Sequence, residues 1–129
     1  DFAQPLNVRI TIEPCNRYEV DFIHNAQDAL AVIQEVNRSN FGVMLDVFHM
    51  NIEDASIEQS LKELKPYLWH VHIADSNRLA PGQGHLDFES ILNALREIGY
   101  SEYISAEMQP LPDPDTAARL TIEYLKPLL

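Results

Sequence analysis

The sequence predicts an α/β fold built from four consecutive βα units, and two observations support this. Runs rich in valine, isoleucine and tyrosine alternate with segments whose apolar residues recur at helical spacing. Each run also contains a carboxylate or a histidine at or near its end, and the pattern repeats after about 30 residues, the length of a strand, a crossover helix and two loops. Such alternation is typical of a parallel sheet covered by helices.

Four strands are expected at these runs, over residues 8–13, 41–46, 69–74 and 103–107. Helices are expected over residues 25–38, 56–66, 87–99 and 115–125. Asn25 and Asp87 are suitable N-caps, Ser56 with Gln59 indicates a capping box, and Gly99 is a typical helix stop. The segment around residues 49–51 is expected to be a loop.

The composition indicates one domain over residues 1–129, with 46% hydrophobic residues available for a core. The formal net charge of −11 leaves no basic stripe for phosphates, so no nucleic-acid partner is expected. No stretch approaches 18 consecutive apolar residues, so no membrane association is expected. The single cysteine, Cys15, excludes an internal disulfide and fits the reducing cytoplasm.

Four βα units are half of what a closed (β/α)8 barrel needs. Alone they leave two open sheet edges and one uncovered sheet face. We expect half a barrel rather than a small open sheet, because the candidate ligands come from successive strands, as around a barrel mouth. Such a half is expected to self-associate through its open edges, or to pair with the missing N-terminal half.

Four side chains with metal-binding groups stand at or near the carboxyl ends of the expected strands: Glu13, Asp46, His72 and Glu107. Parallel strands joined by helices bring these ends to one edge of the sheet. Three carboxylates gathered there repel one another unless they are protonated or bind a cation. The sequence therefore predicts a divalent metal site.

Four phrases of the sequence also resemble a known family: IEPCNRYE (12–19), LDVFHMNIE (45–53), HVHIADSNR (70–78) and PGQGHLDF (81–88). They are similar to the xylose isomerase-like TIM barrels, and most similar to the sugar isomerase/epimerase branch that contains ketose 3-epimerases of the D-tagatose 3-epimerase type. The resemblance covers only the C-terminal half of such a barrel, its fifth to eighth strands.

The resemblance implies that Glu13, Asp46, His72 and Glu107 are the metal ligands. Three carboxylates and one imidazole suit Mn²⁺ best, with Mg²⁺ or Co²⁺ as alternatives. It also implies a metal-dependent epimerase acting on a ketose, in which the metal acidifies the C3 proton. Glu13 and Glu107 would act on opposite faces of that carbon, one forming a cis-enediolate and the other returning a proton.

Further residues match the family. His49 and Arg78 match substrate-contacting residues that donate hydrogen bonds to sugar oxygens. The alternatives are a buried histidine tied to a backbone carbonyl and a surface arginine paired with Asp75 or Glu19.

Asn16, Arg17 and Glu19 match an Asn-Arg-x-Glu signature and are expected to form a shell that orients Glu13. A loop salt bridge between Arg17 and Glu19 is an equal alternative. His70 is assigned no chemistry and is expected to face the helices.

Other functions stay open at this point. An aldose–ketose or hydroxypyruvate-type isomerase could use the same barrel, although the Asn-Arg-Tyr-Glu stretch at residues 16–19 favours the epimerase. An apurinic endonuclease relative is disfavoured by five histidines and the acidic charge. The remaining alternative is a non-catalytic half-barrel: without the walls of the first four strands a substrate would be poorly positioned, so the chain alone is expected to be weakly active or inactive.

Overall fold

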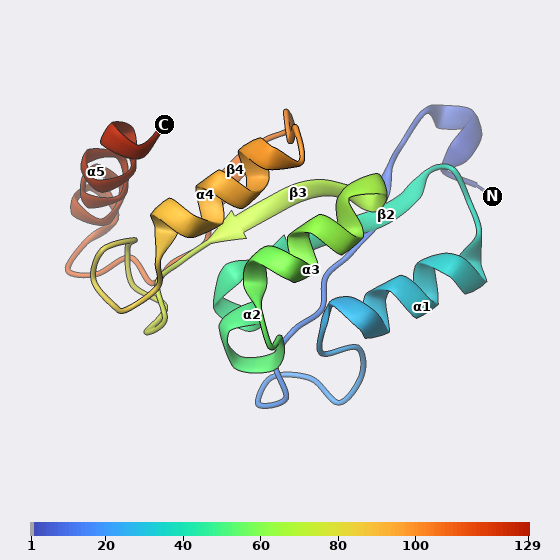
Figure 1. Ribbon diagram of the computed structural model, residues 1–129, viewed down its shortest axis with the longest axis horizontal. Coiled ribbons are helices and arrows are strands. Elements are labelled where there is room, and N and C mark those ends of the chain that lie inside the picture. Colours follow the sequence, from blue (N-terminus) through green and yellow to red (C-terminus); the bar gives the residue numbers. More distant parts are fainter. Residues whose placement is uncertain (1) are drawn as a thin grey trace.

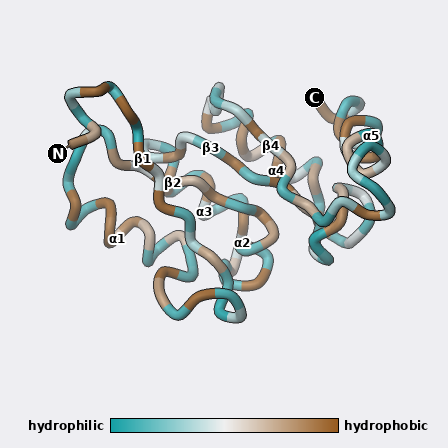
Figure 2. The backbone as a smooth tube through the Cα atoms, turned by 180° about the vertical axis from the view of Figure 1, so that it is seen from behind, coloured by the Kyte–Doolittle hydropathy of each residue, from teal (hydrophilic) through white to brown (hydrophobic). Residues whose placement is uncertain are grey.

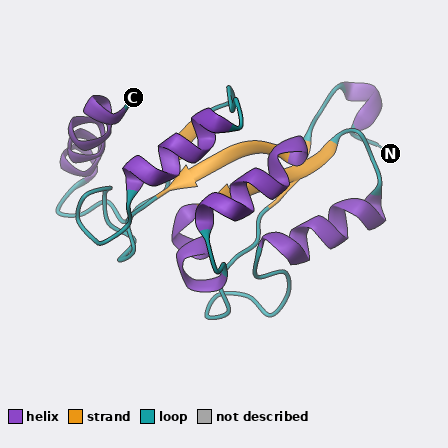
Figure 3. Ribbon diagram, viewed as in Figure 1, coloured by secondary structure: helices purple, strands orange, loops and turns teal. Residues whose placement is uncertain are grey.

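The computed structural model describes residues 2–129 and contains a parallel four-stranded sheet in the order β1-β2-β3-β4. Its strands are β1 (Ile10–Ile12), β2 (Phe41–Asp46), β3 (Leu68–Ile73) and β4 (Ile104–Ala106). Its α-helices are α1 (Ala26–Val36), α2 (Val47–Glu53), α3 (Ile57–Leu64), α4 (Phe88–Glu97) and α5 (Pro114–Leu125). Short 3-10 turns cover Gln4–Leu6, Lys65–Tyr67 and Lys126–Leu128. The α/β prediction is confirmed (Figures 1 and 3).

The two edge strands are shorter than expected. β1 pairs with β2 only from Ile10 to Ile12, and β4 also has three residues. An edge strand has one neighbour, so its ladder of hydrogen bonds stops where that neighbour diverges. Val8 and Tyr103, predicted as strand residues, therefore lie outside the sheet, 48% and 80% exposed.

The expected helix starts are largely correct. The side chains of Asn25, Ser56 and Asp87 each accept the backbone N–H three residues further on. The capping box is only half formed, because the side chain of Gln59 donates to Glu63 instead of returning to Ser56. α5 starts one residue earlier than expected, with proline in its first turn.

Helix α2 corrects the sequence prediction, which placed a loop there. Asp46 ends β2 and is also the N-cap of α2, accepting the N–H of Phe48 at 2.9 Å. Seven residues give too few apolar repeats for a helical period to be visible. As a result, His49 lies on a helix and is buried.

Helices cover one face of the sheet. Figure 1 shows α1, α3 and α4 in front of the strands, and Figure 2 gives the view from behind. The core between these layers takes its strand residues from Val43, Leu45, Val71 and Ile73. On the opposite face, Met44, His70 and His72 are only partly buried. None of the helices in residues 2–129 combines the length and apolar character that a membrane span requires.

Candidate metal centre

The carboxyl end of the sheet brings the four predicted ligands together. Asp46 is paired in register with His72, Glu13 directly follows β1 and Glu107 directly follows β4. One ligand atom from each of the four side chains lies within 4.8 Å of the others. Residues that span most of the chain therefore share one small volume.

Two polar atoms of this cluster are buried without a hydrogen-bond partner, Oε1 of Glu13 and Nδ1 of His72. They lie 3.9 Å apart, and Nδ1 of His72 is 3.3 Å from Oε2 of Glu107. Leaving such an atom unsatisfied costs about 1–3 kcal/mol. Three carboxylates and one imidazole that face one another, two of them with unsatisfied atoms, fit a bound divalent cation.

The two glutamates of the cluster differ electrostatically. Burial raises the pKa of Glu13, and the neighbouring carboxylates of Asp46 and Glu107 raise it further. Burial would also raise the pKa of Glu107, but His72 and Arg78 outweigh it and hold this pKa below its ordinary value. In the metal-free cluster, the surroundings therefore favour the protonated form of Glu13 more than that of Glu107.

Arg78 reaches into the cluster from the loop after β3. Its Nη1 donates to Oδ2 of Asp46 at 2.6 Å, and its Nη2 donates to Oε2 of Glu107. The guanidinium also lies over the ring of Phe48, 4.6 Å from the ring centre. Arg78 thus pairs with two candidate ligands, and not with either of the carboxylates that the sequence offered as an alternative.

His49 is held by Asn16. The backbone N–H of Asn16 donates to Nδ1 of His49 at 3.4 Å, and the side-chain amide nitrogen of Asn16 lies 2.8 Å from the same atom. That amide also donates to Glu19 at 2.8 Å. Because Nδ1 accepts these bonds, Nε2 carries the proton in the neutral ring. Burial lowers the pKa of His49, so the neutral ring is favoured further.

His49 lies beside the first ligand: its ring, the carboxylate of Glu13 and Sγ of Cys15 offer ligand atoms within 4.8 Å of one another. The histidine is thus bound to an asparagine amide, and not to a backbone carbonyl. Its Nε2–H is the hydrogen-bond donor that it has left to offer.

Arg17 points away from this cluster. Its backbone N–H, Nε and Nη2 donate to Glu53 at 2.7, 2.9 and 2.8 Å. These bonds lower the pKa of Glu53 to about 2. Of the three residues of the signature, Asn16 and Glu19 lie around His49, whereas Arg17 fastens the loop to the end of α2 and forms its salt bridge with Glu53 instead of Glu19.

The prediction that His70 faces the helices is wrong. Side chains two residues apart on a strand point to the same face. The rings of His70 and His72 are in edge contact, with centres 5.0 Å apart, and Nε2 of His70 lies 2.6 Å from Oγ of Ser105. His70 therefore lies on the uncovered face of the sheet, beside the candidate ligand.

Asp75, an alternative partner of Arg78 in the sequence, instead binds the backbone of its own loop. It is fully buried and accepts backbone N–H groups from its own loop. An aspartate two residues after a strand, followed by a loop with two glycines, is a pattern that could have indicated this arrangement.

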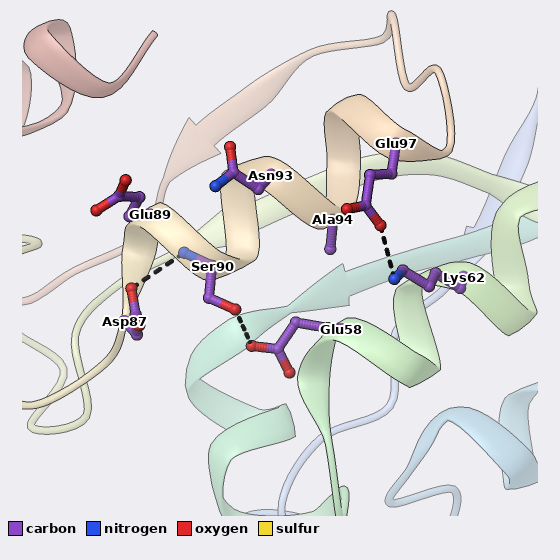
Figure 4. A pocket seen from close by; sticks show the side chains of 8 residues that line it. All are labelled: Glu58, Lys62, Asp87, Glu89, Ser90, Asn93, Ala94 and Glu97. Atoms are coloured by element: carbon purple, nitrogen blue, oxygen red, sulfur yellow. Dashed lines mark hydrogen bonds and ion pairs between the residues drawn. The ribbon is translucent and has the colours of Figure 1, made fainter.

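A separate cleft lies between α3 and α4, with a volume of about 380 Å³ (Figure 4). Its polar groups largely satisfy one another: Oγ of Ser90 donates to Glu58 at 2.7 Å, and Lys62 pairs with Glu97 at 2.7 Å. None of the predicted site residues lines it.

Comparison with known proteins places the chain in a family context. A family model described as a xylose isomerase-like TIM barrel matches residues 1–128. The D-psicose 3-epimerase of Agrobacterium fabrum (strain C58 / ATCC 33970) is 38% identical over 107 residues, which are 83% of this chain and 37% of that protein.

Solved structures show the same relation. A crystal structure of D-allulose 3-epimerase from Methylomonas sp. superposes with a TM-score of 0.92 and 32% identity, covering 100% of this chain and 51% of that one. A structure of IOLI protein with a binding zinc atom gives a TM-score of 0.83 and 28% identity, covering 99% of this chain and 51% of that one. The chain thus spans about half of these two structures, as a half-barrel would.

Proposed function

Since the chain belongs to the xylose isomerase-like TIM barrel family, we propose that it carries the metal-binding half of a sugar epimerase that inverts a ketose at C3. The observation that carries this proposal is the cluster of Glu13, Asp46, His72 and Glu107, in which two buried polar atoms have no hydrogen-bond partner. The similarity to a D-psicose 3-epimerase supports the substrate class.

The four clustered side chains would hold the metal, for which we propose Mn²⁺, with Mg²⁺ or Co²⁺ as alternatives. A donor set dominated by carboxylate oxygens favours these ions over a structural zinc. When bound, the metal would polarise the C2 carbonyl and the C3 hydroxyl of the ketose and so acidify the proton on C3. The zinc in the IOLI protein structure supports a divalent ion in this fold.

Glu13 and Glu107 would remove and return the proton on C3. Inversion at one carbon needs a group that removes a proton from one face and a group that returns it on the other, through a cis-enediolate. The two glutamates follow the two edge strands, β1 and β4, and each offers a carboxylate oxygen to the same cluster, which supports such a division.

His49 and Arg78 would position the sugar. Nε2–H of His49 and the guanidinium of Arg78 are donors at the edge of the cluster, suited to the oxygens at C1 and C2. Asn16 and Glu19 would keep the His49 ring in its orientation and tautomer.

The uncovered sheet face requires a second half. We propose that further βα units close it, since β1 and β4 leave open edges and His70 and Met44 lie on that face. The 129-residue chain by itself would then self-associate and show weak activity or none, because half of the substrate pocket is missing. Light scattering at micromolar concentration tests this: a monomer without a tendency to associate would contradict it.

Deuterium exchange tests the chemistry. The full-length protein is incubated with Mn²⁺ and D-fructose or D-tagatose in D₂O, and NMR follows deuterium at each carbon. We expect deuterium at C3 together with the C3 epimer. Deuterium at C1 with an aldose product would favour the isomerase, and no exchange at any carbon would refute both.

Two variants sharpen the test. Glu13→Gln and Glu107→Gln each remove one of the two groups, so each should stop inversion more strongly than exchange at C3. Glu102→Gln is the matched control, because Glu102 pairs at the surface with Arg9 and lies outside the cluster. Equal loss of exchange and inversion in both active-site variants, with Mn²⁺ still bound by calorimetry, would contradict the two-group scheme.

A further inference from the structure

Asp75 is a buried carboxylate that the proposed chemistry does not use. It lies two residues beyond β3 and is 0% exposed. Its Oδ1 accepts the N–H of Ser76 at 2.7 Å and that of Leu86 at 3.1 Å, and its Oδ2 accepts the N–H of Gly82 at 2.8 Å. These donors come from both ends of the loop between β3 and α4, so the side chain of Asp75 holds the two ends of the loop together.

The bonds to Asp75 are strong enough to keep it ionised. Burial would raise its pKa, but backbone N–H groups, those of Leu86, Ser76 and Gly84 among them, outweigh burial and hold the pKa below its ordinary value. Hydrogen bonds to an ionised acceptor are about twice as strong as neutral ones. The loop is also packed tightly there: a Cβ added to Gly84 would lie 2.3 Å from Oδ1 of Asp75.

The same loop presents Arg78 in a constrained conformation. Arg78 has a φ of 63°, in the left-handed region, which is unfavourable for a residue other than glycine. Its N–H donates to the carbonyl of Asp75 at 2.8 Å, and its carbonyl accepts the N–H of Gln109 at 2.7 Å. From this fixed backbone the guanidinium reaches Asp46 and Glu107.

We propose that Asp75 is a positioning residue for Arg78: by closing the loop on itself, its carboxylate holds the guanidinium against the metal-binding carboxylates. This inference rests on the proposed function, in which Arg78 and the metal share one site. The physical reason is that the left-handed backbone at Arg78 persists only while the surrounding loop is held. Without the carboxylate, the loop would relax and the guanidinium would leave the cluster.

Two variants of the full-length protein release the loop in different ways. Asp75→Asn replaces the charged acceptor, and Gly84→Ala pushes a methyl group against it without changing any charge. Gly99→Ala is the control for strain outside this loop: Gly99 follows α4 with a φ of 69°, which strains an alanine, and nothing lies within 4 Å of the added Cβ. Arg78→Lys identifies the Arg78 signals in protein labelled with ¹⁵N-arginine.

The first readout is NMR of the metal-free protein. A guanidinium held by two carboxylates rotates slowly and gives separate Nη–H signals. We expect these signals for Arg78 in the parent and in Gly99→Ala, and their loss in both Asp75→Asn and Gly84→Ala. Separate Arg78 signals that survive in both loop variants would overturn the proposal.

The second readout is Mn²⁺ affinity by calorimetry. The positive charge of Arg78 opposes a cation at the same carboxylates, so releasing it should tighten Mn²⁺ binding about fivefold, as Arg78→Gln should also do. In protein that already carries Arg78→Gln, Gly84→Ala should not change the Mn²⁺ affinity further. Weaker binding in Gly84→Ala would instead show a general disturbance of the site and overturn the proposal.

The two readouts separate this inference from the proposed function. If the parent binds no Mn²⁺ but the Arg78 signals still disappear in both loop variants, the metal site is wrong and the positioning role stands. If Mn²⁺ binds and the signals do not change, the metal site stands and the positioning role is wrong.

Discussion

Replacing Asp46 by asparagine tests how the centre of the site is held. Asp46 is 0% exposed, with Oδ1 on the N–H of Phe48 and Oδ2 on Nη1 of Arg78 at 2.6 Å. Asparagine keeps an oxygen for the helix cap but loses the charge that faces the guanidinium. Removing one partner of a fully buried ion pair costs about 3–5 kcal/mol. Because the side chain of Arg78 is 19% exposed and keeps its bond to Glu107, we expect about 2–3 kcal/mol here.

The assay is thermal unfolding followed by circular dichroism with EDTA present. At this chain length 1 kcal/mol shifts the melting temperature by roughly 3–5 °C, so Asp46→Asn should melt about 10 °C below the parent. Asp46→Ala also loses the cap of α2 and should cost about 1 kcal/mol more. Addition of Mn²⁺ should raise the melting temperature of the parent and leave both variants unchanged.

Asp113→Asn is the matched control. Asp113 caps α5 at the surface through the N–H of Thr116, so the same substitution keeps the cap and removes no buried ion pair. Its melting temperature should stay close to that of the parent. If Asp46→Asn and Asp113→Asn have the same melting temperature, the pairing of Asp46 with Arg78 does not stabilise the fold and the reasoning fails.

Three further predictions concern titrating groups. Folding raises the pKa of Glu13, so the folded protein loses stability as pH rises above 4.5, the ordinary pKa of a glutamate. Glu13→Gln should therefore be more stable than the metal-free parent at pH 7 and equally stable at pH 3. Urea unfolding at the two pH values measures this difference. The pKa of Glu53 is lowered to about 2, so the stabilisation by Glu53 is present above pH 4.5 and disappears as pH falls through about 2. Arg17→Ala loses the side-chain bonds but keeps the backbone N–H on Glu53, so it should reduce this pH dependence; an unchanged acid-unfolding curve would contradict the prediction. His49 should show a protonated Nε2 and remain neutral when pH falls below 6.5, which ¹⁵N NMR of the ring can check. Asn16→Ala removes the side-chain amide but keeps the backbone N–H on Nδ1, so the tautomer preference should weaken.

Strand and helix positions in the centre of the fold could be predicted because their signals are local. β2 matches its predicted range, and the caps at Asn25 and Asp87 follow from residue chemistry at a single position. The edges could not be predicted to the residue, since pairing of β1 and β4 depends on where a neighbouring strand diverges. The sequence did not indicate α2, because Asp46 is both the last residue of β2 and the N-cap of α2.

The meeting of the four candidate ligands could be predicted for a topological reason: right-handed βα units place the ends of successive strands together whatever the loops do. From the order of the residues alone, one can therefore infer the α/β class and the meeting of Glu13, Asp46, His72 and Glu107. Only the tertiary structure decides the partners of the long and the buried polar side chains. It pairs Arg78 with Asp46 and Glu107, and Arg17 with Glu53. It also places Asp75 at the centre of its loop. Such partners depend on distances of a few ångströms between segments that are remote in the chain, and no local pattern encodes those distances.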